Sequence, residues 1–168
     1  MEYVKKALSL ANEKGFNLVT AESLTAGLIT SSFAEIPGAS QVLLAGFVVY
    51  TAKAKTTILS VSEALIERYG IVSEELARAM ATAALIKAQE MIKSEKLISI
   101  AVTGIAGPTG GTKKTPVGTV CIASSCFLRD GIIYAESETA NFTGNRNEVR
   151  QKTVKKAVQK IIKVLEKI

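Results

Sequence analysis

The sequence predicts an α/β fold: a three-layer α/β/α sandwich around a mixed, mostly parallel sheet of about five strands. Segments with helical periodicity alternate with short apolar runs typical of buried strands, which favours parallel strands covered by helices. Two strand-like segments flank a turn near the C-terminus, which predicts one C-terminal β-hairpin. A chain of 168 residues suits a single domain with a sizeable core, so we expect one domain over residues 1–168.

The expected elements, in chain order, are a helix over residues 2–14, a strand over 16–21, a helix over 23–35, a strand over 42–50, helices over 53–59, 63–69 and 74–93, strands over 97–103, 118–127 and 132–142, and a helix from about 146 to the end. Gly15 ends the first helix, and Ser62 and Ser73 occupy N-cap positions. Gly46, inside the second strand, indicates a bulge or a close approach. The Leu-Arg-Asp-Gly sequence at 128–131 is the expected hairpin turn.

The composition indicates a soluble cytoplasmic protein. No apolar run is long enough to span a membrane, and the N-terminus lacks a signal-peptide pattern. Cys121 and Cys126 lie five residues apart in one expected strand, so they should face opposite sides of the sheet and stay unpaired. Buried free thiols are typical of a reducing compartment.

Missing residue types exclude several chemistries. The chain has no histidine, so a Ser-His-Asp or Cys-His mechanism is impossible. Its only aspartate, Asp130, lies in the expected hairpin turn and not in the glycine-rich segment 103–120, where it could hold magnesium beside a bound phosphate. We therefore expect no metal site and no cofactor, and acid–base chemistry falls to lysine, tyrosine, glutamate or a thiol.

The net charge of +6 does not by itself favour a nucleic-acid partner. Much of the excess lies on the last helix, where lysines occupy one face and apolar residues the other. No aromatic residues interleave with these lysines, and no nucleic-acid-binding motif is present. A solvated helix face explains the charge better, and the expected partner is a small molecule. The sequence leaves a homo-oligomer open.

Residues 103–120 hold five of the twelve glycines and two of the three prolines, directly after an expected strand. Glycines there let backbone amides approach a ligand closely. Side-chain donors for an anion are also present: Thr103, Thr109, Thr112, Lys113 and Lys114. The spacing fits neither a P-loop nor a dinucleotide-binding fingerprint. The segment is either a ligand-binding loop or a surface loop whose glycines only turn the chain.

Ser23 lies between an expected strand and an expected helix. At a helix N-terminus it would neighbour the free amides of Leu24, Thr25 and Ala26. A hydroxyl beside free amides at a positive dipole end resembles a nucleophile beside an oxyanion hole. Serine is also a favoured N-cap that stabilises a helix by about 1 kcal/mol. Position alone favours the capping interpretation.

A serine nucleophile needs a base, and lysine, tyrosine and Glu22 are the candidates in this chain. Tyr50, Lys53 and Lys55 follow the second strand, so they can reach the same sheet edge as Ser23. A lysine base must be largely neutral, which requires its pKa to fall from about 10.4 towards 7 or 8 through burial or a neighbouring cation. Spacing does not decide between the two lysines, nor between a base and a solvated side chain.

Several segments together resemble the CinA C-terminal domain family, which includes nicotinamide mononucleotide amidases of the PncC type. These segments are 20–27 (TAESLTAG), 46–50 (GFVVY) with Ala54 and Lys55, 103–111 (TGIAGPTGG), 116–120 (PVGTV) and 142–150 (FTGNRNEVR). They run in order over nearly the whole chain. The resemblance implies a stand-alone form, without the N-terminal domain similar to molybdopterin-binding proteins that many relatives carry.

The resemblance implies a metal-free amidase that converts nicotinamide mononucleotide to nicotinic acid mononucleotide and ammonia. Ser23 would be the nucleophile, Lys55 the general base, and Tyr50 a proton relay or orienting group. The substrate-binding residues it implies are Leu24, Thr25, Ala26, Thr103, Gly104, Ile105, Gly107, Gly110, Gly111, Thr112 and Arg146. Arg146 would meet a phosphate near a helix N-terminus.

The chain departs from the family pattern at three positions of the implied site. Leu24 and Ala26 stand where relatives often have Cys and Gly, and Asn145 replaces the usual Asp. These changes bear on the shape of the oxyanion turn and on the orientation of Arg146. A non-catalytic nucleotide-binding or regulatory module of the same fold is the alternative; it would bind nucleotide without turnover.

Overall fold

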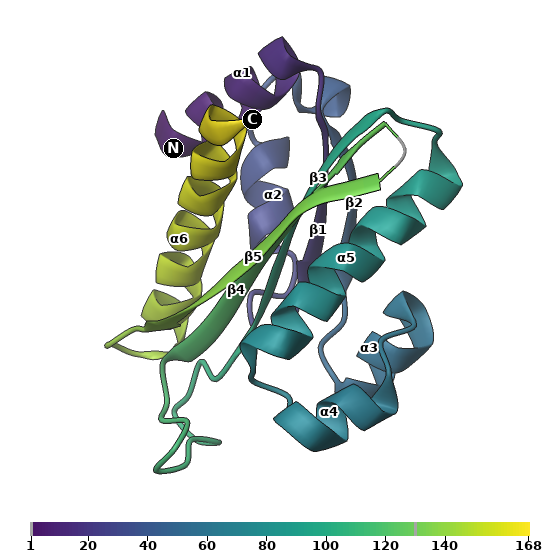
Figure 1. Cartoon of the computed structure of the whole chain (residues 1–168). Coiled ribbons are helices and arrows are strands. Elements are labelled where there is room, and N and C mark those ends of the chain that lie inside the picture. Colours follow the sequence, from purple (N-terminus) through teal and green to yellow (C-terminus); the bar gives the residue numbers. More distant parts are fainter. Residues whose placement is uncertain (1, 130) are drawn as a thin grey trace.

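A five-stranded mixed sheet forms the centre of the protein (Figure 1). The computed structural model describes residues 2–129 and 131–168. The strand order is β2-β1-β3-β4-β5. Their bounds are β1 (Asn17–Glu22), β2 (Leu43–Val48), β3 (Lys96–Gly104), β4 (Thr119–Leu128) and β5 (Gly131–Asn141). β1 pairs in parallel with β2 and β3, whereas β4 is antiparallel to both of its neighbours. The predicted C-terminal hairpin, β4–β5, is confirmed, and Asp130 of its expected turn lies outside the described residues.

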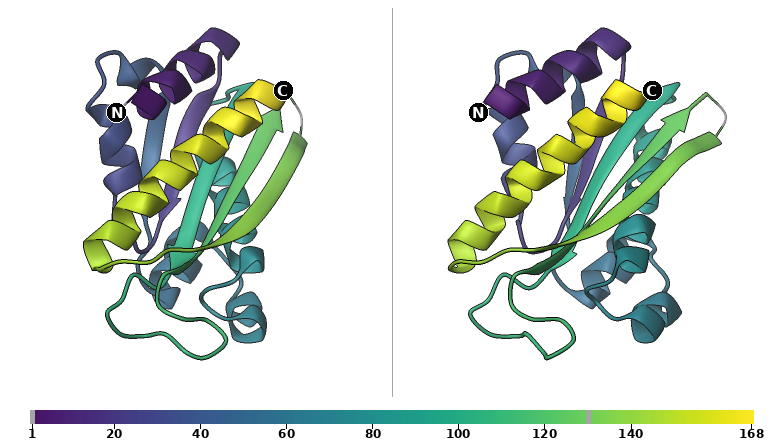
Figure 2. Two further views of the ribbon diagram at one scale, coloured as in Figure 1. Left: turned by 90° about the vertical axis from the view of Figure 1, so that its left-hand side faces the viewer. Right: turned by 60° about the vertical axis from the view of Figure 1, so that its left-hand side comes forward.

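Helices cover both faces of the sheet, which confirms the three-layer prediction (Figure 2). One face carries α1 (Glu2–Lys14), α2 (Leu28–Ala34) and α6 (Arg146–Lys167). The other carries α3 (Ala52–Leu59), α4 (Glu63–Tyr69) and α5 (Glu74–Met91). A short 3₁₀ turn at Ala39–Gln41, absent from the sequence prediction, leads into β2. No helix of the described chain is both long and apolar enough to cross a bilayer.

Alternating side chains of the central strands divide the core in two. On β3, Ile98 and Ile100 pack towards α1, α2 and α6, whereas Leu97 and Ala101 pack towards α5. Small residues on the buried side of α5 bring this helix close to the sheet: Ala77, Ala81, Ala84 and Ala88. The side-chain period of two along a strand produces this division.

The two cysteines lie on opposite faces of β4, as predicted. Cys126 belongs to the core beneath α6 and Cys121 to the core beneath α5, and both are free. Burial raises the pKa of both thiols, that of Cys126 to about 12. Neither sulfur is therefore a thiolate nucleophile at neutral pH.

The predicted helix over residues 23–35 is wrong in its first turn and a half, because α2 begins only at Leu28. Residues 23–27 form a separate turn in which Ala26 and Gly27 adopt φ values of 52° and 93°. The buried carboxylate of Glu22 accepts hydrogen bonds from the amides of Gly27, Ile29 and Thr30. A side chain from the strand therefore satisfies the start of α2, and Ser23 does not cap it.

Gly46 is a point of close approach, as predicted. A Cβ at this position of β2 would overlap the side chain of Thr30 on α2. The two expected N-caps differ: Ser73 accepts a hydrogen bond from the amide of Leu76, whereas Ser62 occupies the N-cap position of α4 without a side-chain bond. The close contact between β2 and α2 brings the chain after β2 next to the turn after β1.

Candidate active site

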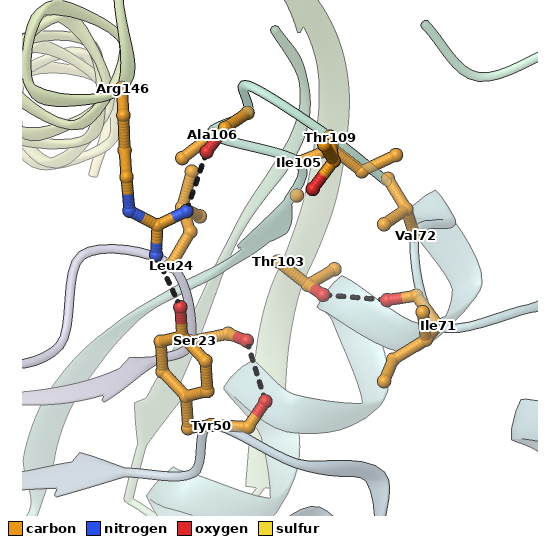
Figure 3. Close-up of a pocket in the computed structure, with 12 residues that line it drawn as sticks. Ser23, Leu24, Tyr50, Ile71, Val72, Thr103, Ile105, Ala106, Thr109 and Arg146 are labelled. Atoms are coloured by element: carbon orange, nitrogen blue, oxygen red, sulfur yellow. Dashed lines mark hydrogen bonds between the residues drawn. The ribbon is translucent and has the colours of Figure 1, made fainter. Parts of the chain in front are cut away.

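A cavity of about 210 Å³ opens where β1, β2 and β3 end (Figure 3). Parallel strands bring their carboxyl ends to one edge of a sheet, where α/β proteins commonly bind ligands. Ser23 follows β1, Tyr50 follows β2, and Thr103 and Gly104 end β3. The residues that line the cavity are Ser23, Leu24, Tyr50, Ile71, Val72, Thr103, Gly104, Ile105, Ala106, Gly107, Thr109 and Arg146.

Ser23 and Lys55 are in direct contact at the base of this cavity. The Lys55 Nζ atom lies 3.0 Å from Ser23 Oγ, 2.9 Å from the carbonyl oxygen of Val49 and 3.2 Å from that of Tyr50. The two carbonyls can only accept hydrogen bonds, whereas the serine hydroxyl can either accept or donate. In the structure Lys55 donates to Ser23 Oγ, and the Ser23 hydroxyl donates to the Tyr50 carbonyl at 3.3 Å. If Lys55 is neutral and the hydroxyl turns towards it, Lys55 can donate to the two carbonyls and accept from Ser23.

Lys55 is completely buried, with a side chain that is 0% exposed to solvent. It forms no ion pair within the described residues. Desolvation by burial lowers its pKa from the ordinary 10.5 to about 8. Lys53, in contrast, projects into solvent and lies 3.7 Å from the carboxylate of Glu63. Lys55 is therefore the lysine that the fold brings to Ser23.

Ser23 lies in a tight turn whose amides are unequally available. Its own amide donates to the carbonyl of Val102, and the amide of Ala26 donates to the carbonyl of Ser23. Thr25 is completely buried, and its hydroxyl has no partner within the described chain. Of the three amides predicted to form an oxyanion hole, only that of Leu24 both lacks an acceptor in the described structure and belongs to a residue of the cavity wall.

Tyr50 and Arg146 meet across the mouth of the cavity (Figure 3). Arg146 donates to the Tyr50 hydroxyl at 2.6 Å and to the carbonyl oxygen of Gly107 at 2.7 Å. The Tyr50 side chain is 49% exposed. Its backbone carbonyl, not its phenol, accepts hydrogen bonds from Ser23 and Lys55. Tyr50 therefore reaches the serine through its main chain and Arg146 through its side chain.

The glycine-rich segment contributes its first half to the cavity. Thr103 is buried there, but its hydroxyl donates to the carbonyl of Ile71, so that proton is not available to an anion. The amides of Ala106, Gly107 and Thr109 have no acceptor within the described chain. Gly110, Gly111 and Thr112 are absent from the cavity wall, and the Thr112 amide and hydroxyl form a local turn with Thr115. These three predicted substrate-binding residues are not brought to the site.

The start of α6 differs from the predicted anion site at a helix N-terminus. The Asn145 side chain accepts hydrogen bonds from the amides of Asn147 and Glu148, and the Glu148 carboxylate accepts one from the Asn145 amide. This capping box occupies the amides of Asn147 and Glu148 and leaves that of Arg146 without an acceptor in the described chain. Of the first-turn residues, Arg146 lines the cavity, and its guanidinium is the cation that it offers there.

Some residues of the site were not expected from the sequence. Ile71 and Val72 enter the cavity wall from the segment between α4 and α5, and nothing in their sequence marks them. Arg150 donates to the carbonyls of Leu24 and Thr25, across most of the chain length. No group of three metal-ligating side chains occurs in the part of the chain that the structure describes.

The model of the CinA C-terminal domain family matches residues 2–165. The chain belongs to this family. A putative competence-damage inducible protein of Symbiobacterium thermophilum is 39% identical over 93% of the chain, and a CinA-like protein of Fervidobacterium nodosum is 43% identical over 84%. The CinA-family chain spans about a third of the length of these curated relatives, since the matches cover 36% and 32% of them.

Solved structures of similar proteins have the same fold over nearly their whole length. The competence/damage inducible protein CihA of Agrobacterium tumefaciens superposes with a TM-score of 0.87 at 34% identity, covering 98% of this chain and 94% of that one. A competence or damage-inducible protein of Enterobacter asburiae gives 0.83 at 32% identity, covering 98% and 96%. The fold is therefore shared along nearly the whole chain.

Proposed function

We propose that this protein is an amidohydrolase that converts nicotinamide mononucleotide to nicotinic acid mononucleotide and ammonia, with Ser23 as nucleophile and Lys55 as general base. The observation that carries the proposal is the 3.0 Å contact between Lys55 Nζ and Ser23 Oγ, made by a lysine with a pKa of about 8. A buried amine of lowered pKa beside a hydroxyl is a nucleophile–base pair that needs no histidine. Family membership supports the choice of reaction.

The reaction proceeds in two steps, acylation of Ser23 and hydrolysis of the resulting acyl-enzyme. Ser23 Oγ attacks the carboxamide carbon while its proton passes to Lys55 Nζ; the C–N bond then breaks, and the leaving nitrogen takes this proton to form ammonia. Water attacks the resulting ester, gives a proton to Lys55, and releases the carboxylic acid as Ser23 regains its hydroxyl. The negative charge of each tetrahedral intermediate would be stabilised by the Leu24 amide, a donor of the type worth roughly 3 kcal/mol.

The wall of the cavity supports an anionic substrate. Arg146 is its charged side chain, and none of the described residues that line it is acidic. The unpaired amides of Ala106, Gly107 and Thr109 add donors suited to a phosphate. In this proposal Tyr50 acts as an orienting group, because its phenol contacts Arg146 and its carbonyl contacts both Ser23 and Lys55.

Ammonia release from nicotinamide mononucleotide by the purified protein tests the proposal. Wild type should release ammonia, and Ser23→Ala should lose at least about a thousandfold in kcat because the covalent route is closed. The variant should still bind the nucleotide, measured as a rise in melting temperature. Full activity of Ser23→Ala would exclude the serine mechanism. Nucleotide binding without ammonia release by wild type would favour the non-catalytic binding module instead.

A further inference from the structure

Arg150 joins the second turn of α6 to the turn that carries Ser23. Its Nε atom lies 3.0 Å from the carbonyl oxygen of Leu24, and one terminal nitrogen lies 3.0 Å from that of Thr25. Hydrogen bonds from a charged donor are about twice as strong as neutral ones. The Arg150 guanidinium therefore donates hydrogen bonds to the two successive carbonyls that follow Ser23.

The turn depends on such outside contacts for its shape. Residues 23–27 lie outside any helix, and Ala26 has a φ of 52°, which is uncommon for a residue with a side chain. Conformations of this kind persist where the surroundings fix them. Glu22 fixes the far end of the turn through the amide of Gly27, and Arg150 fixes its middle.

Arg150 is itself well anchored and has no competing partner. The neighbouring α6 residues Val149 and Thr153 are completely buried. Within residues 2–129 and 131–168, Arg150 forms no ion pair and donates only to the two turn carbonyls. Arg150 is thus a partly buried charge whose described partners all belong to one backbone turn. This indicates that Arg150 has a role at that turn.

Peptide geometry connects this contact to the reacting groups. In a trans peptide the C=O of one residue and the N–H of the next point in opposite directions. Because the Ser23 carbonyl faces the Ala26 amide, the Leu24 N–H points away from the interior of the turn. Holding the Leu24 and Thr25 carbonyls keeps this arrangement, and with it the direction of Ser23 Oγ towards Lys55, 3.0 Å away.

We propose that Arg150 is a positioning residue for the Ser23 nucleophile and for the Leu24 amide beside it. The proposal rests on the amidase proposed above. Arg150 would not touch the substrate, so its loss should misplace reacting groups without weakening substrate binding. Misplacement of about 1 Å can cost about a hundredfold in rate.

Kinetics of Arg150→Lys and Arg150→Ala test this role. Lysine keeps the charge but cannot hold two carbonyls at once. We expect kcat to fall about 10- to 100-fold in both variants, with KM changed less than about threefold. Guanidinium chloride at tens of millimolar should restore part of the activity of Arg150→Ala and none of that of Ser23→Ala. Lys155→Met, which removes an exposed charge from the same helix, should behave as wild type.

Fluorophosphonate labelling separates this proposal from the choice of substrate. Ser23 Oγ would bond to phosphorus as fluoride leaves and the hydroxyl proton passes to Lys55, and mass spectrometry gives the rate at Ser23. Slower labelling of Arg150→Lys than of wild type would support a positioning role for Arg150. It would do so even if wild type released no ammonia, because the lack of ammonia would overturn only the proposed amidase activity. Equal labelling rates, an unchanged kcat, a loss confined to KM, or a folded Arg150→Ala that guanidinium does not rescue would each overturn the role of Arg150.

Discussion

Lys55 shows how one buried side chain can set the chemistry of a site. Nothing in the described structure offers it a counter-charge, so burial alone lowers its pKa to about 8. Its three polar neighbours are two backbone carbonyls and one hydroxyl. The carbonyls favour the N–H donors, and only the hydroxyl can supply a proton to the neutral amine. If Lys55 is the base of the proposed amidase, Ser23 is the described neighbour from which it can take a proton.

The pH dependence of the proposed amidase activity should reflect the protonation state of Lys55. A base must be neutral, and the lowered pKa makes Lys55 neutral above about pH 8 instead of above 10.5. We expect kcat/KM to rise about tenfold per pH unit up to a plateau that begins near pH 8. Ammonia release measured from pH 6 to pH 10 checks this.

Lys55→Arg provides the matched variant, because its guanidinium stays charged throughout this range. It should be inactive at every pH. A wild-type profile that is flat between pH 6 and pH 9, or substantial activity in Lys55→Arg, would mean that another group accepts the proton.

At the scale of secondary structure, the junction between β1 and α2 decides where Ser23 lies. Five hydrogen bonds reach the buried carboxylate of Glu22, three from backbone amides and two from the hydroxyls of Thr20 and Thr30. The carboxylate thus takes the place of an N-cap side chain, because it accepts hydrogen bonds from the free amides at the start of α2. Ser23 is left free to face Lys55.

Glu22→Gln should destabilise the protein markedly. A glutamine amide keeps one acceptor oxygen, but its NH₂ group would face donors that then have no acceptor. We expect the free energy of unfolding to fall by about 2–4 kcal/mol, as is typical when buried bonds to a charged group are lost. Urea denaturation followed by circular dichroism measures it. Glu35→Gln, an exposed carboxylate at the other end of α2, should change stability by less than about 0.5 kcal/mol. Similar values for the two variants would contradict the capping role.

The same junction shows what the sequence could and could not predict. The apolar periodicity located all five strands and both helical layers, and the parallel strand ends predicted that Ser23 and Tyr50 share one edge. The start of α2 was predicted five residues early, because Ser23 has the sequence features of an N-cap, whereas the free donors are satisfied by the side chain of Glu22 at the end of β1. Spacing could not distinguish Lys55 from Lys53, since only the fold buries one and exposes the other. Arg150 was beyond prediction because its partners lie about 125 residues away in the chain.

At the scale of the whole molecule, α6 closes the site from the far end of the sequence. Arg146 and Arg150 are one helical turn apart and reach three different segments: the glycine loop, Tyr50 and the serine turn. Residues four apart on a helix lie on the same face. The C-terminal helix therefore acts as a rigid frame that holds the cavity wall and the proposed nucleophile in register.

This arrangement predicts which cation holds the phosphate of the proposed substrate. Arg146 lines the cavity, whereas Lys113 and Lys114 are exposed in the outer part of the loop. In a Ser23→Ala background that prevents turnover, Arg146→Ala should weaken the affinity for nicotinamide mononucleotide about 10- to 100-fold, the loss expected for a charge-assisted contact. Lys113→Ala should change it less than about twofold. Isothermal titration calorimetry or the ligand-induced rise in melting temperature measures both.

Tyr50→Phe is the control for this experiment, because it removes the hydroxyl that accepts from Arg146 and leaves the guanidinium in place. If Arg146 acts through the phosphate, the loss of affinity in Arg146→Ala should exceed that in Tyr50→Phe. It should also shrink for nicotinamide riboside, the ligand without a phosphate. Equal losses for both ligands would show that Arg146 supports the cavity wall through Tyr50 and Gly107, and that the phosphate is bound elsewhere. Comparing the two ligands thus distinguishes direct recognition of the phosphate by Arg146 from a structural role of Arg146 in the cavity wall.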